Sequence, residues 1–412
     1  GDADAMEPCH APLIHGEGEP LAAINACGQL SYGVYANRDD RDAIHRLPDF
    51  SFAGYRRGGV ALPTADVVET LSPAPGDARS RIQAAIDRVS ELPRGPTGLR
   101  GAVLLRAGEY QVGDTLRIEA SGVVLRGEGQ GTQGTILTAT RPVQHDLIAV
   151  EGGGEGLGEV QGTRVRIADA VVPVGSVTFA VDASDAFSPG DDVGVLRTPN
   201  QRWIDTLDMA RWGWSAGSYH IAHERRVVSV EGDQITVDAP LVDAIEERFG
   251  GGSLFRANLE NRVEQVGIED LRLISNYRGN TDEDHGWKAV RLRRTAHSWV
   301  RGVTAVHFGY SAVSLEDQSS FNTVQECAML APVSQVTGGR RYAFNLSGGT
   351  GNLFQRNYAE ASRHDFVSGA RTTGPNVWLD CYSRASSNDD GPHHRWATGV
   401  LLDNTQSLFL HV

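Results

Sequence analysis

The chain has 412 residues, 48 glycines and a formal net charge of −14. The acidic balance argues against non-specific nucleic-acid binding, which needs a basic surface, so we expect no nucleic-acid partner. No apolar stretch approaches the roughly 20 residues of a transmembrane helix, so we expect no membrane span. The sequence does not indicate an oligomeric state.

Residues 1–75 form a loop-rich N-terminal segment. It contains Cys9 and Cys27, which are candidates for a disulfide in an oxidising compartment. Cys327 and Cys381 fall inside apolar runs instead, and we expect them to be buried thiols. The chain begins GDADAMEP without a signal peptide, which fits a processed, exported protein. We therefore expect a secreted or periplasmic location.

Residues 76–159 are expected to hold one helix followed by the first coils of β structure. Apolar residues at helical spacing indicate a helix over 78–92, which Pro93 ends. These residues are Ile82, Ala85, Ile86 and Val89. Short apolar runs follow, separated by turn signals such as GEGQGTQG.

The phrases RIQAAIDRV, GAVLLRAGEYQVGDTLRI and SGVVLRGEGQGTQGTIL resemble the first coils of the pectate-lyase-like superfamily of carbohydrate-active proteins. The resemblance covers about 78–150 and 262–412. It implies an all-β fold, a right-handed parallel β-helix, with an N-terminal helix that caps the first coil. The fold is shared by lyases, hydrolases, transferases and non-enzymatic spikes, so the resemblance indicates no single reaction.

Residues 160–255 interrupt the coil pattern. The phrases VTFAVDAS and RRVVSVEGDQITVDAPL indicate antiparallel strands, with EGDQ as a hairpin turn. We therefore predict an inserted antiparallel β subdomain at 160–255, and main β-helix coils over 256–412. Within the insert, Trp212 and Trp214 can stack on sugar rings or belong to a small core of the subdomain.

The main coils are indicated by a two-part phrase that occurs five times after Lys288. Each phrase has a first apolar run, then a polar residue and a second apolar run, as in a solenoid without helices. The first runs are AVRL (289–292), AVSL (312–315), AFNL (343–346), DFVS (365–368) and GVLL (399–402). The second runs are SWV (298–300), NTV (322–324), NLF (352–354), NVW (376–378) and SLF (407–409). We expect Asn322, Asn352 and Asn376 to form a side-chain ladder in the turns.

The residues just before the first runs share one corner of successive coils, and this corner is the predicted binding site. Coils stack about 4.8 Å apart, so these side chains would form one strip rich in His, Tyr and Arg. The strip contains His285, Lys288, His307, Tyr310, Arg341, Tyr342, Arg363 and His364, and the last coil adds His393, His394 and Arg395.

A positive strip on an acidic protein fits an anionic polysaccharide or oligosaccharide, and we expect a lyase that cleaves a uronic-acid polymer by β-elimination. This reaction needs a base, a group that stabilises the enolate-like anion, and an acid. Lys288, Tyr342 and His364 are the candidate base or acid groups. Arginines of the strip, with Arg395 among them, are candidates to bind carboxylates in bidentate fashion.

Two alternatives remain open. A glycoside hydrolase or an intramolecular transglycosylase would use paired carboxylates, for which Asp365, Asp389 and Asp390 are candidates. A non-catalytic carbohydrate-binding protein is the other. The resemblance to β-helix lyases also implies that Ca²⁺ is often used, and the acidic triplet Asp282–Asp284 is the one candidate; the metal is otherwise unknown.

Overall fold

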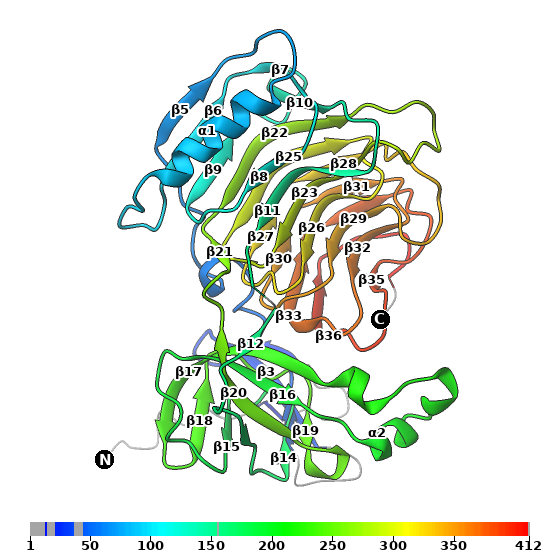
Figure 1. The fold of residues 1–412 in the computed structure, drawn as a ribbon. Helices are drawn as coiled ribbons and strands as arrows, with labels where there is room; N and C mark the ends of the chain where they lie inside the picture. The colour runs from blue at the N-terminus through cyan, green and yellow to red at the C-terminus, as the bar shows by residue number, and fades with distance from the viewer. Residues whose placement is uncertain (1–12, 15–20, 37–43, 155, 411–412) are drawn as a thin grey trace. The chain divides into compact units, whose positions relative to one another are not determined.

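The computed structural model describes residues 13–14, 21–36, 44–154 and 156–410 (Figure 1). The chain divides into two compact units, and each is described by itself. The solenoid unit comprises Ser51–Gly156, Leu259–Thr372 and Asn376–Val412. The insert unit comprises Gly1–Phe50, Leu157–Asn258 and Thr373–Pro375.

These limits bear on the predicted segments. The predicted insert at 160–255 falls within Leu157–Asn258, and the loop-rich segment 1–75 is divided between the two units after Phe50. Cys27 is disulfide-bonded, and its predicted partner, Cys9, lies outside the described residues. Among the described residues, no helix has the length and apolar character that crossing a membrane would require.

The solenoid unit is a parallel β-helix, as predicted. Its first sheet has seven strands, each parallel to its neighbours. They are β8 (Leu116–Ile118), β11 (His145–Glu151), β23 (Gly286–Arg293), β26 (Ser311–Glu316), β29 (Tyr342–Leu346), β32 (His364–Ser368) and β35 (Gly391–Pro392).

The second sheet has fourteen strands. Its two long strands are β22 (Gly267–Ser275) and β25 (Trp299–Val306), which pair with each other. The first half of each long strand pairs with one set of shorter strands, and the second half pairs with another set. One set is β5 (Val67–Leu71), β6 (Gly101–Leu105), β9 (Val123–Arg126), β27 (Thr323–Gln325), β30 (Leu353–Gln355), β33 (Thr373–Leu379) and β36 (Thr398–Asp403). The other set is β7 (Gly108–Val112), β10 (Thr135–Ala139), β28 (Ala328–Leu330), β31 (Tyr358–Glu360) and β34 (Tyr382–Arg384). Two short strands, β21 (Val263–Glu264) and β24 (Thr295–Ala296), pair separately.

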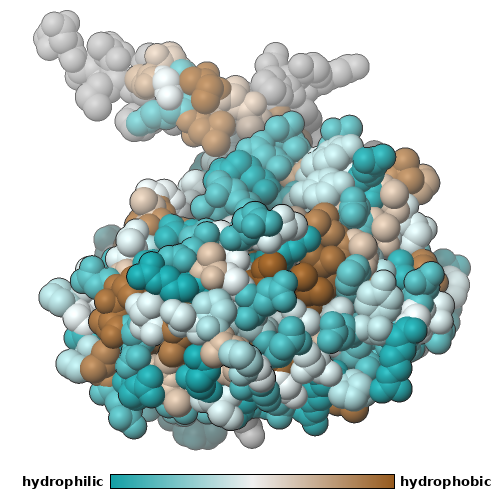
Figure 2. All heavy atoms as spheres, turned by 90° about the horizontal axis from the view of Figure 1, so that it is seen from above, coloured by the Kyte–Doolittle hydropathy of each residue, from teal (hydrophilic) through white to brown (hydrophobic). Residues whose placement is uncertain are grey.

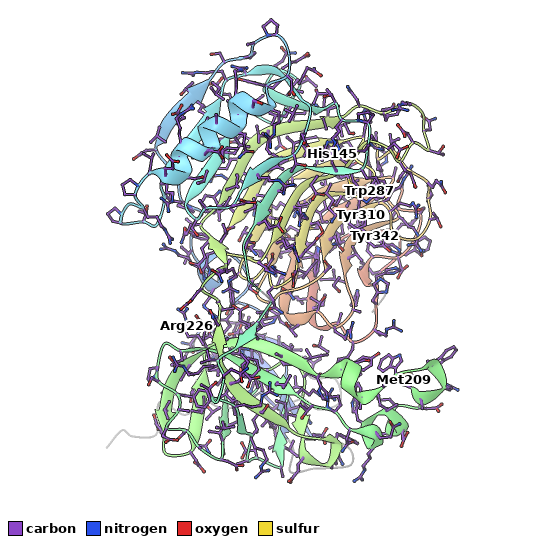
Figure 3. All side chains as sticks on the ribbon, in the orientation of Figure 1. His145, Met209, Arg226, Trp287, Tyr310 and Tyr342 are labelled. Atoms are coloured by element: carbon purple, nitrogen blue, oxygen red, sulfur yellow. The ribbon has the colours of Figure 1, made fainter. Side chains whose placement is uncertain are left out.

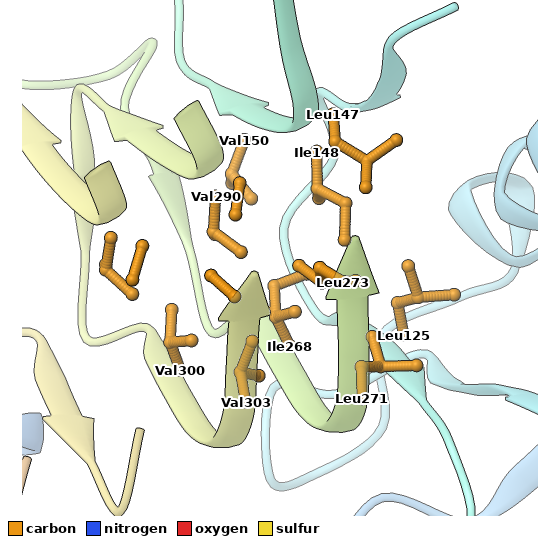
Figure 4. Close-up of a cluster of buried hydrophobic side chains, with 14 of the residues drawn as sticks. Leu125, Leu147, Ile148, Val150, Ile268, Leu271, Leu273, Val290, Val300 and Val303 are labelled. Atoms are coloured by element: carbon orange, nitrogen blue, oxygen red, sulfur yellow. The ribbon is translucent and has the colours of Figure 1, made fainter. Parts of the chain in front are cut away.

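The register of the first sheet confirms the alignment of the first four phrases. Val290 pairs with Val313, Val313 with Phe344, and Phe344 with Phe366. The register therefore sets Ala289, Ala312 and Ala343 at one level, and all three are fully buried. The interior is a single apolar cluster built from strands of both sheets, part of which is drawn in Figure 4.

The fifth phrase is aligned wrongly in the sequence-based prediction. GVLL (399–402) lies in β36, which follows β33 in the second sheet. The strand that continues the first sheet is β35, where Gly391 pairs with Val367. The cause is local, because β35 is a two-residue Gly-Pro strand with no apolar pattern to align.

The predicted asparagine ladder is present in the turns between the two sheets. Asn322 Nδ2 donates to Asn352 Oδ1 at 3.1 Å, and Asn352 Nδ2 donates to Asn376 Oδ1 at 3.2 Å. All three side chains are fully buried. Buried amides need such partners, so the ladder fixes the turn from coil to coil.

Helix α1 (Arg79–Glu91) confirms the predicted helix. Its residues Ile82, Ala85, Ile86 and Val89 belong to the solenoid core. The helix packs against β5, β6, β8 and β9, and Asp77 Oδ1 accepts a hydrogen bond from the backbone N–H of Arg79. Its role as a cap for the first coil stays a prediction.

The insert unit is built mainly from antiparallel strands around its own apolar cluster. Its main sheet contains β12 (Gly158–Glu159), β13 (Val165–Arg166), β15 (Thr178–Ala180), β16 (Asp192–Arg197), β17 (Ile221–Glu231), β18 (Gln234–Val237) and β20 (Gly252–Asn258). The unit also contains β1 (Leu13–Ile14), β2 (Ala22–Ile24), β3 (Leu30–Ala36), β4 (Ile44–Arg46), β14 (Val171–Val172), β19 (Ile245–Glu246), helix α2 (Gln201–Thr206) and three short 3-10 helices, η3 (Ala210–Trp212), η4 (Ala216–Tyr219) and η5 (Glu247–Phe249).

The surface is mainly polar. The face seen in Figure 2 is largely hydrophilic, with small apolar areas scattered over it.

Candidate functional site

Aromatic side chains gather along the first sheet, four of them at the starts of successive strands and one, His393, directly after β35. Trp287 stacks near Tyr310 with ring centroids 6.3 Å apart, and Tyr310 lies 5.2 Å from Tyr342. The rings of His364 and His393 lie 5.2 and 5.6 Å from Tyr342. Figure 3 shows Trp287, Tyr310 and Tyr342 along the same side of the sheet. We call these five residues the aromatic row.

Four of these five residues were predicted from sequence, and Trp287 was missed. A signal was available, because Trp287 and Tyr310 occupy equivalent positions before their apolar runs. The row follows the stacking of the coils. Trp287, Tyr310 and His393 are partly exposed, whereas Tyr342 and His364 are buried.

Farther along the same strands lies a network of ion pairs. Lys288 Nζ lies 2.5 Å from Glu316 Oε1, and the same oxygen accepts a hydrogen bond from Ser314 at 2.6 Å. Arg291 Nε lies 2.6 Å from Asp146 Oδ2 and its Nη2 lies 3.2 Å from Glu151 Oε2. The predicted strip is therefore not uniformly positive.

The ion pairs change the chemical properties of Glu151 and Lys288. Burial alone would raise the pKa of Glu151, but hydrogen bonds from Arg293 and Arg291 lower it. Lys288 forms an ion pair with the carboxylate of Glu316. An ion-paired ammonium group suits the stabilisation of negative charge on a substrate better than it suits proton abstraction. Glu316 was not among the residues predicted from sequence, since a single Glu after a strand carries no distinctive signal.

At the other end of the aromatic row, a His–Tyr–Arg cluster consists of Tyr342, Arg363, His364 and His393. Arg363 Nη1 donates to the Tyr342 hydroxyl at 3.4 Å, and no ion pair with a carboxylate is found for Arg363 among the described residues. The rings of His364 and His393 lie 3.9 Å apart. Burial lowers the pKa of His364. Burial, with repulsion from His364 and His394, lowers the pKa of His393 to about 4.

These shifts define the charge of the cluster. Both imidazoles are neutral at neutral pH, because their pKa values lie below it. Tyr342 is mostly buried at 8% exposure, whereas Arg363 and His393 are partly exposed. The cluster thus combines one cation, one phenol hydroxyl and two neutral imidazoles at a partly open surface.

Two predicted binding residues are occupied by structural contacts. His285 is buried, with Nδ1 2.9 Å from the Ser275 hydroxyl and Nε2 2.9 Å from the Val333 carbonyl oxygen. Arg341 donates to the Ser334 carbonyl at 2.7 Å and to the Ala361 carbonyl at 3.1 Å. Both side chains therefore hold the loops that connect the second sheet to the first.

Three further predicted residues, His307, His394 and Arg395, lie outside the aromatic row. The ring of His307 lies 4.8 Å from that of Tyr277, and burial lowers the pKa of His307. His394 and Arg395 are exposed. Because β35 ends at Pro392, they follow the strand of the first sheet rather than precede it, contrary to the sequence alignment.

Asp365 lies inside the solenoid rather than on its outer face. It occupies the level of Ala343 in the first sheet and is fully buried. Burial, with the charge of Asp390, raises the pKa of Asp365 to about 7. Asp390 is also buried, and its Oδ1 accepts hydrogen bonds from the backbone N–H groups of Asp365 and Phe366. These two carboxyl groups face the core.

The predicted tryptophans belong to the insert unit. Trp214 stacks on Tyr219 with centroids 4.3 Å apart, and lies 6.1 Å from Trp203. Trp212 is 67% exposed. Trp214 therefore belongs to a small aromatic core, the alternative that the sequence left open, and Trp212 is the tryptophan of the two that is available to a ligand.

Two carboxylates of the acidic triplet make other contacts. Asp282 accepts backbone hydrogen bonds from Arg278 and Asp284 at 2.8 and 3.0 Å. Glu283 pairs with Arg340, with Oε2 2.8 Å from Nη2. Calcium needs six to eight oxygen ligands, and the carboxylates of Asp282 and Glu283 are engaged in other contacts, so calcium stays a prediction.

A separate cavity of about 490 Å³ lies on the outer face of the second sheet. It is bordered by the segment around Tyr55 and by a polar row of Arg301, Gln325 and Gln355 on neighbouring strands. The sequence analysis did not identify it, since the turn-rich segment before residue 62 carries no signal of where it packs.

No family model and no curated protein matches the chain. Among solved structures, a tailspike of Pseudomonas phage LKA1 matches 79% of this chain and 48% of its own, with 14% identity and a TM-score of 0.48. A tailspike of Acinetobacter baumannii bacteriophage AP22, solved with capsular saccharide, matches 76% and 58%, with 11% identity and a TM-score of 0.32. A mannuronan C-5 epimerase module from Azotobacter vinelandii matches 80% and 65%, with 14% identity and a TM-score of 0.38. The chain thus spans about half of the first tailspike, and no activity follows from these similarities.

Proposed function

We propose that this chain binds a uronic-acid-containing polysaccharide along the aromatic row and cleaves it by β-elimination at the His–Tyr–Arg cluster. The observation that carries the proposal is the Arg363 guanidinium beside the Tyr342 hydroxyl, next to two neutral imidazoles. Elimination needs a proton-transfer group and a positive charge at the substrate carboxylate. The cluster contains both within a few ångströms.

The roles follow from the contacts of each group. Tyr342 is the proton-transfer group, since its hydroxyl is the one hydroxyl of the cluster: its oxygen takes the proton α to the uronate carboxylate, and a proton passes to the leaving glycosidic oxygen as the C–O bond breaks and the C=C bond forms. Arg363 binds the uronate carboxylate, for which a planar guanidinium is well suited. Negative charge that develops on the substrate is then stabilised at the place where it forms.

The aromatic row supports a chain substrate. Trp287, Tyr310 and Tyr342 come from three consecutive coils, so their spacing follows the strand spacing of about 4.8 Å. Aromatic faces bind the apolar faces of sugar rings, while the ion-paired strip with Lys288 and Glu316 supplies hydrogen bonds to hydroxyl groups. Such a substrate lies outside cells, and we propose a secreted or periplasmic location.

A hydrolase or intramolecular transglycosylase is less well supported. Either reaction uses a pair of carboxyl groups that flank the scissile bond. Asp365 and Asp390 face the solenoid interior, and Glu316 and Asp146 are paired with Lys288 and Arg291. A non-catalytic carbohydrate-binding protein would use the aromatic row alone, and it is the outcome if binding occurs without products.

The test is a panel of polysaccharides with and without uronic acids. Elimination creates an unsaturated uronate that absorbs in the ultraviolet, whereas hydrolysis creates only reducing ends. We expect ultraviolet-absorbing products from at least one uronic-acid polymer. Reducing ends without that absorbance would refute the elimination, and binding without either product would refute catalysis.

Two matched variants test the role of the hydroxyl. Tyr342→Phe should lower kcat by about 100-fold or more, the usual range for losing a proton-transfer group. Tyr382→Phe removes a hydroxyl from a 44% exposed tyrosine of the second sheet, and it should leave kcat unchanged. Equal activity of the two variants would remove Tyr342 from the mechanism.

A further inference from the structure

We propose that His364, Asp389 and His393 form a binding site for a divalent transition-metal ion. One ligand atom from each residue lies within 4.8 Å of the others. His364 begins β32, whereas Asp389 and His393 flank β35, the next strand of the same sheet. The rings of His364 and His393 lie 3.9 Å apart and His364 contacts Asp389, so the three side chains meet across these two strands.

The contacts of His364 provide independent support. The side chain is fully buried, and its Nδ1 contacts the backbone carbonyl oxygen of Asp389. A carbonyl oxygen only accepts, so this contact assigns the proton to Nδ1. Nε2 then carries a lone pair, yet it is buried without a hydrogen-bond partner. Buried polar atoms are rarely left without partners, and a metal ion would supply one.

The same contact is common around metal-bound histidines, which usually donate their second ring N–H to a carbonyl or carboxylate oxygen. Nδ1 of His364 also lies 3.6 Å from Asp389 Oδ1. One residue, Asp389, thus offers a carboxylate to the site and a backbone carbonyl that orients the neighbouring imidazole.

The ligand types select the metal. Two imidazoles and one carboxylate suit zinc and its neighbours in the first transition row, whereas calcium takes oxygen ligands. Three protein ligands leave a fourth position open.

The trio borders a partly exposed surface, since Asp389 and His393 are both partly exposed. The His393 ring lies 5.6 Å from the Tyr342 ring. Metal binding itself does not depend on the proposed function, because it is measured without any sugar. If the proposed elimination is also correct, a bound ion would add positive charge near the substrate carboxylate.

The experiment is calorimetric titration of the tag-free, chelator-treated full chain with Zn²⁺, and separately with Ca²⁺. We expect one equivalent of Zn²⁺ and no Ca²⁺ binding at this site. Titration with Co²⁺ should give the visible absorption of a four-coordinate site. Absence of Zn²⁺ binding would overturn the proposal, whatever the protein does to polysaccharides.

Two variants locate the ion. His393→Ala should weaken Zn²⁺ binding by more than about 100-fold, since losing even an outer partner of a metal ligand costs roughly 10–100-fold. His394→Ala removes an exposed neighbouring imidazole outside the trio, and it should retain wild-type affinity. Circular dichroism checks that both variants fold. Undiminished affinity in folded His393→Ala, or an equal loss in His394→Ala, would overturn the proposal.

Discussion

Replacing Asp365 by asparagine should stabilise the protein at high pH. Asp365 occupies a level of the first sheet at which the preceding coils carry Ala289, Ala312 and Ala343, and it is fully buried. Ser362, Ser383 and Ser386 lower its pKa in part, but neither carboxyl oxygen has a hydrogen bond of good geometry. Asp390 accepts several hydrogen bonds, so we assign the shared proton to Asp365.

The sign and size of the effect of pH on the free energy of unfolding follow from the difference between the pKa of Asp365 in the folded and unfolded states. Burial and the charge of Asp390 raise the pKa of Asp365 from 3.8 to about 7 in the folded state. Below the unfolded pKa both states are protonated, so Asp365 costs nothing there. As pH rises toward the folded pKa, only the unfolded state releases the proton, and the free energy of unfolding falls. Each pKa unit corresponds to about 1.4 kcal/mol, so the full loss is at most about 4.5 kcal/mol.

An asparagine side chain does not ionise, so it removes this loss. Chemical denaturation should give Asp365→Asn a free energy of unfolding a few kcal/mol above wild type near pH 9, with the difference disappearing near pH 4. Asp403→Asn, at an exposed position of the same unit, is the matched control and should show no such change. A difference between Asp365→Asn and wild type that is the same at both pH values would refute the reasoning.

Three further predictions concern other parts of the molecule. Asn352→Ala should lower the free energy of unfolding by about 2–5 kcal/mol, because it leaves buried partners of the ladder without hydrogen bonds. A loss below about 0.5 kcal/mol in chemical denaturation would contradict the stabilising role of the ladder. Trp214→Ala should lower the thermal stability of the insert unit, whereas the exposed Trp212→Ala should change stability by less than about 0.5 kcal/mol; equal effects would contradict the packing of Trp214. Affinity for a polyuronate should fall as salt rises from about 0.01 to 0.1 M, and Arg363→Gln should flatten this dependence in a binding titration; salt-insensitive binding of the wild type would indicate a neutral glycan.

The fold could be predicted where the interior repeats. Strands that face a continuous core must present apolar residues at equivalent positions, so Val290, Val313 and Phe344 could be aligned by sequence alone. The ladder of Asn322, Asn352 and Asn376 could be predicted for the same reason, because each coil repeats the same turn. The alignment failed at β35, where the sheet continues through glycine and proline.

The candidate site could be predicted only in part. Position before an apolar run identified Tyr342, Arg363 and His364, because the corner of the coil repeats with the strand. It could not distinguish side chains that contact solvent from those that hold loops, such as Arg341, whose partners are backbone carbonyl groups. Nor could it find the carboxylate partners of Arg291, since Asp146 and Glu151 belong to a coil before the insert.

The last coil was the least predictable part. Asp389 follows two serines and an asparagine in a turn, and nothing local to it indicates a neighbour such as His364. The contact arises only because β35 pairs with β32. A site assembled from two coils can be predicted only when the register between their strands is known. A two-residue strand has no sequence pattern from which that register could be derived.

The central claim, cleavage by elimination at the His–Tyr–Arg cluster, is tested most directly by the masses of the products. Elimination breaks the polymer without adding water, whereas hydrolysis adds one water per bond cleaved. Mass spectrometry of the uronate oligosaccharides released by wild type should show products that lack this water. Tyr342→Phe, folded as judged by circular dichroism, should release almost none. Hydrated products, or full release by Tyr342→Phe, would contradict the account.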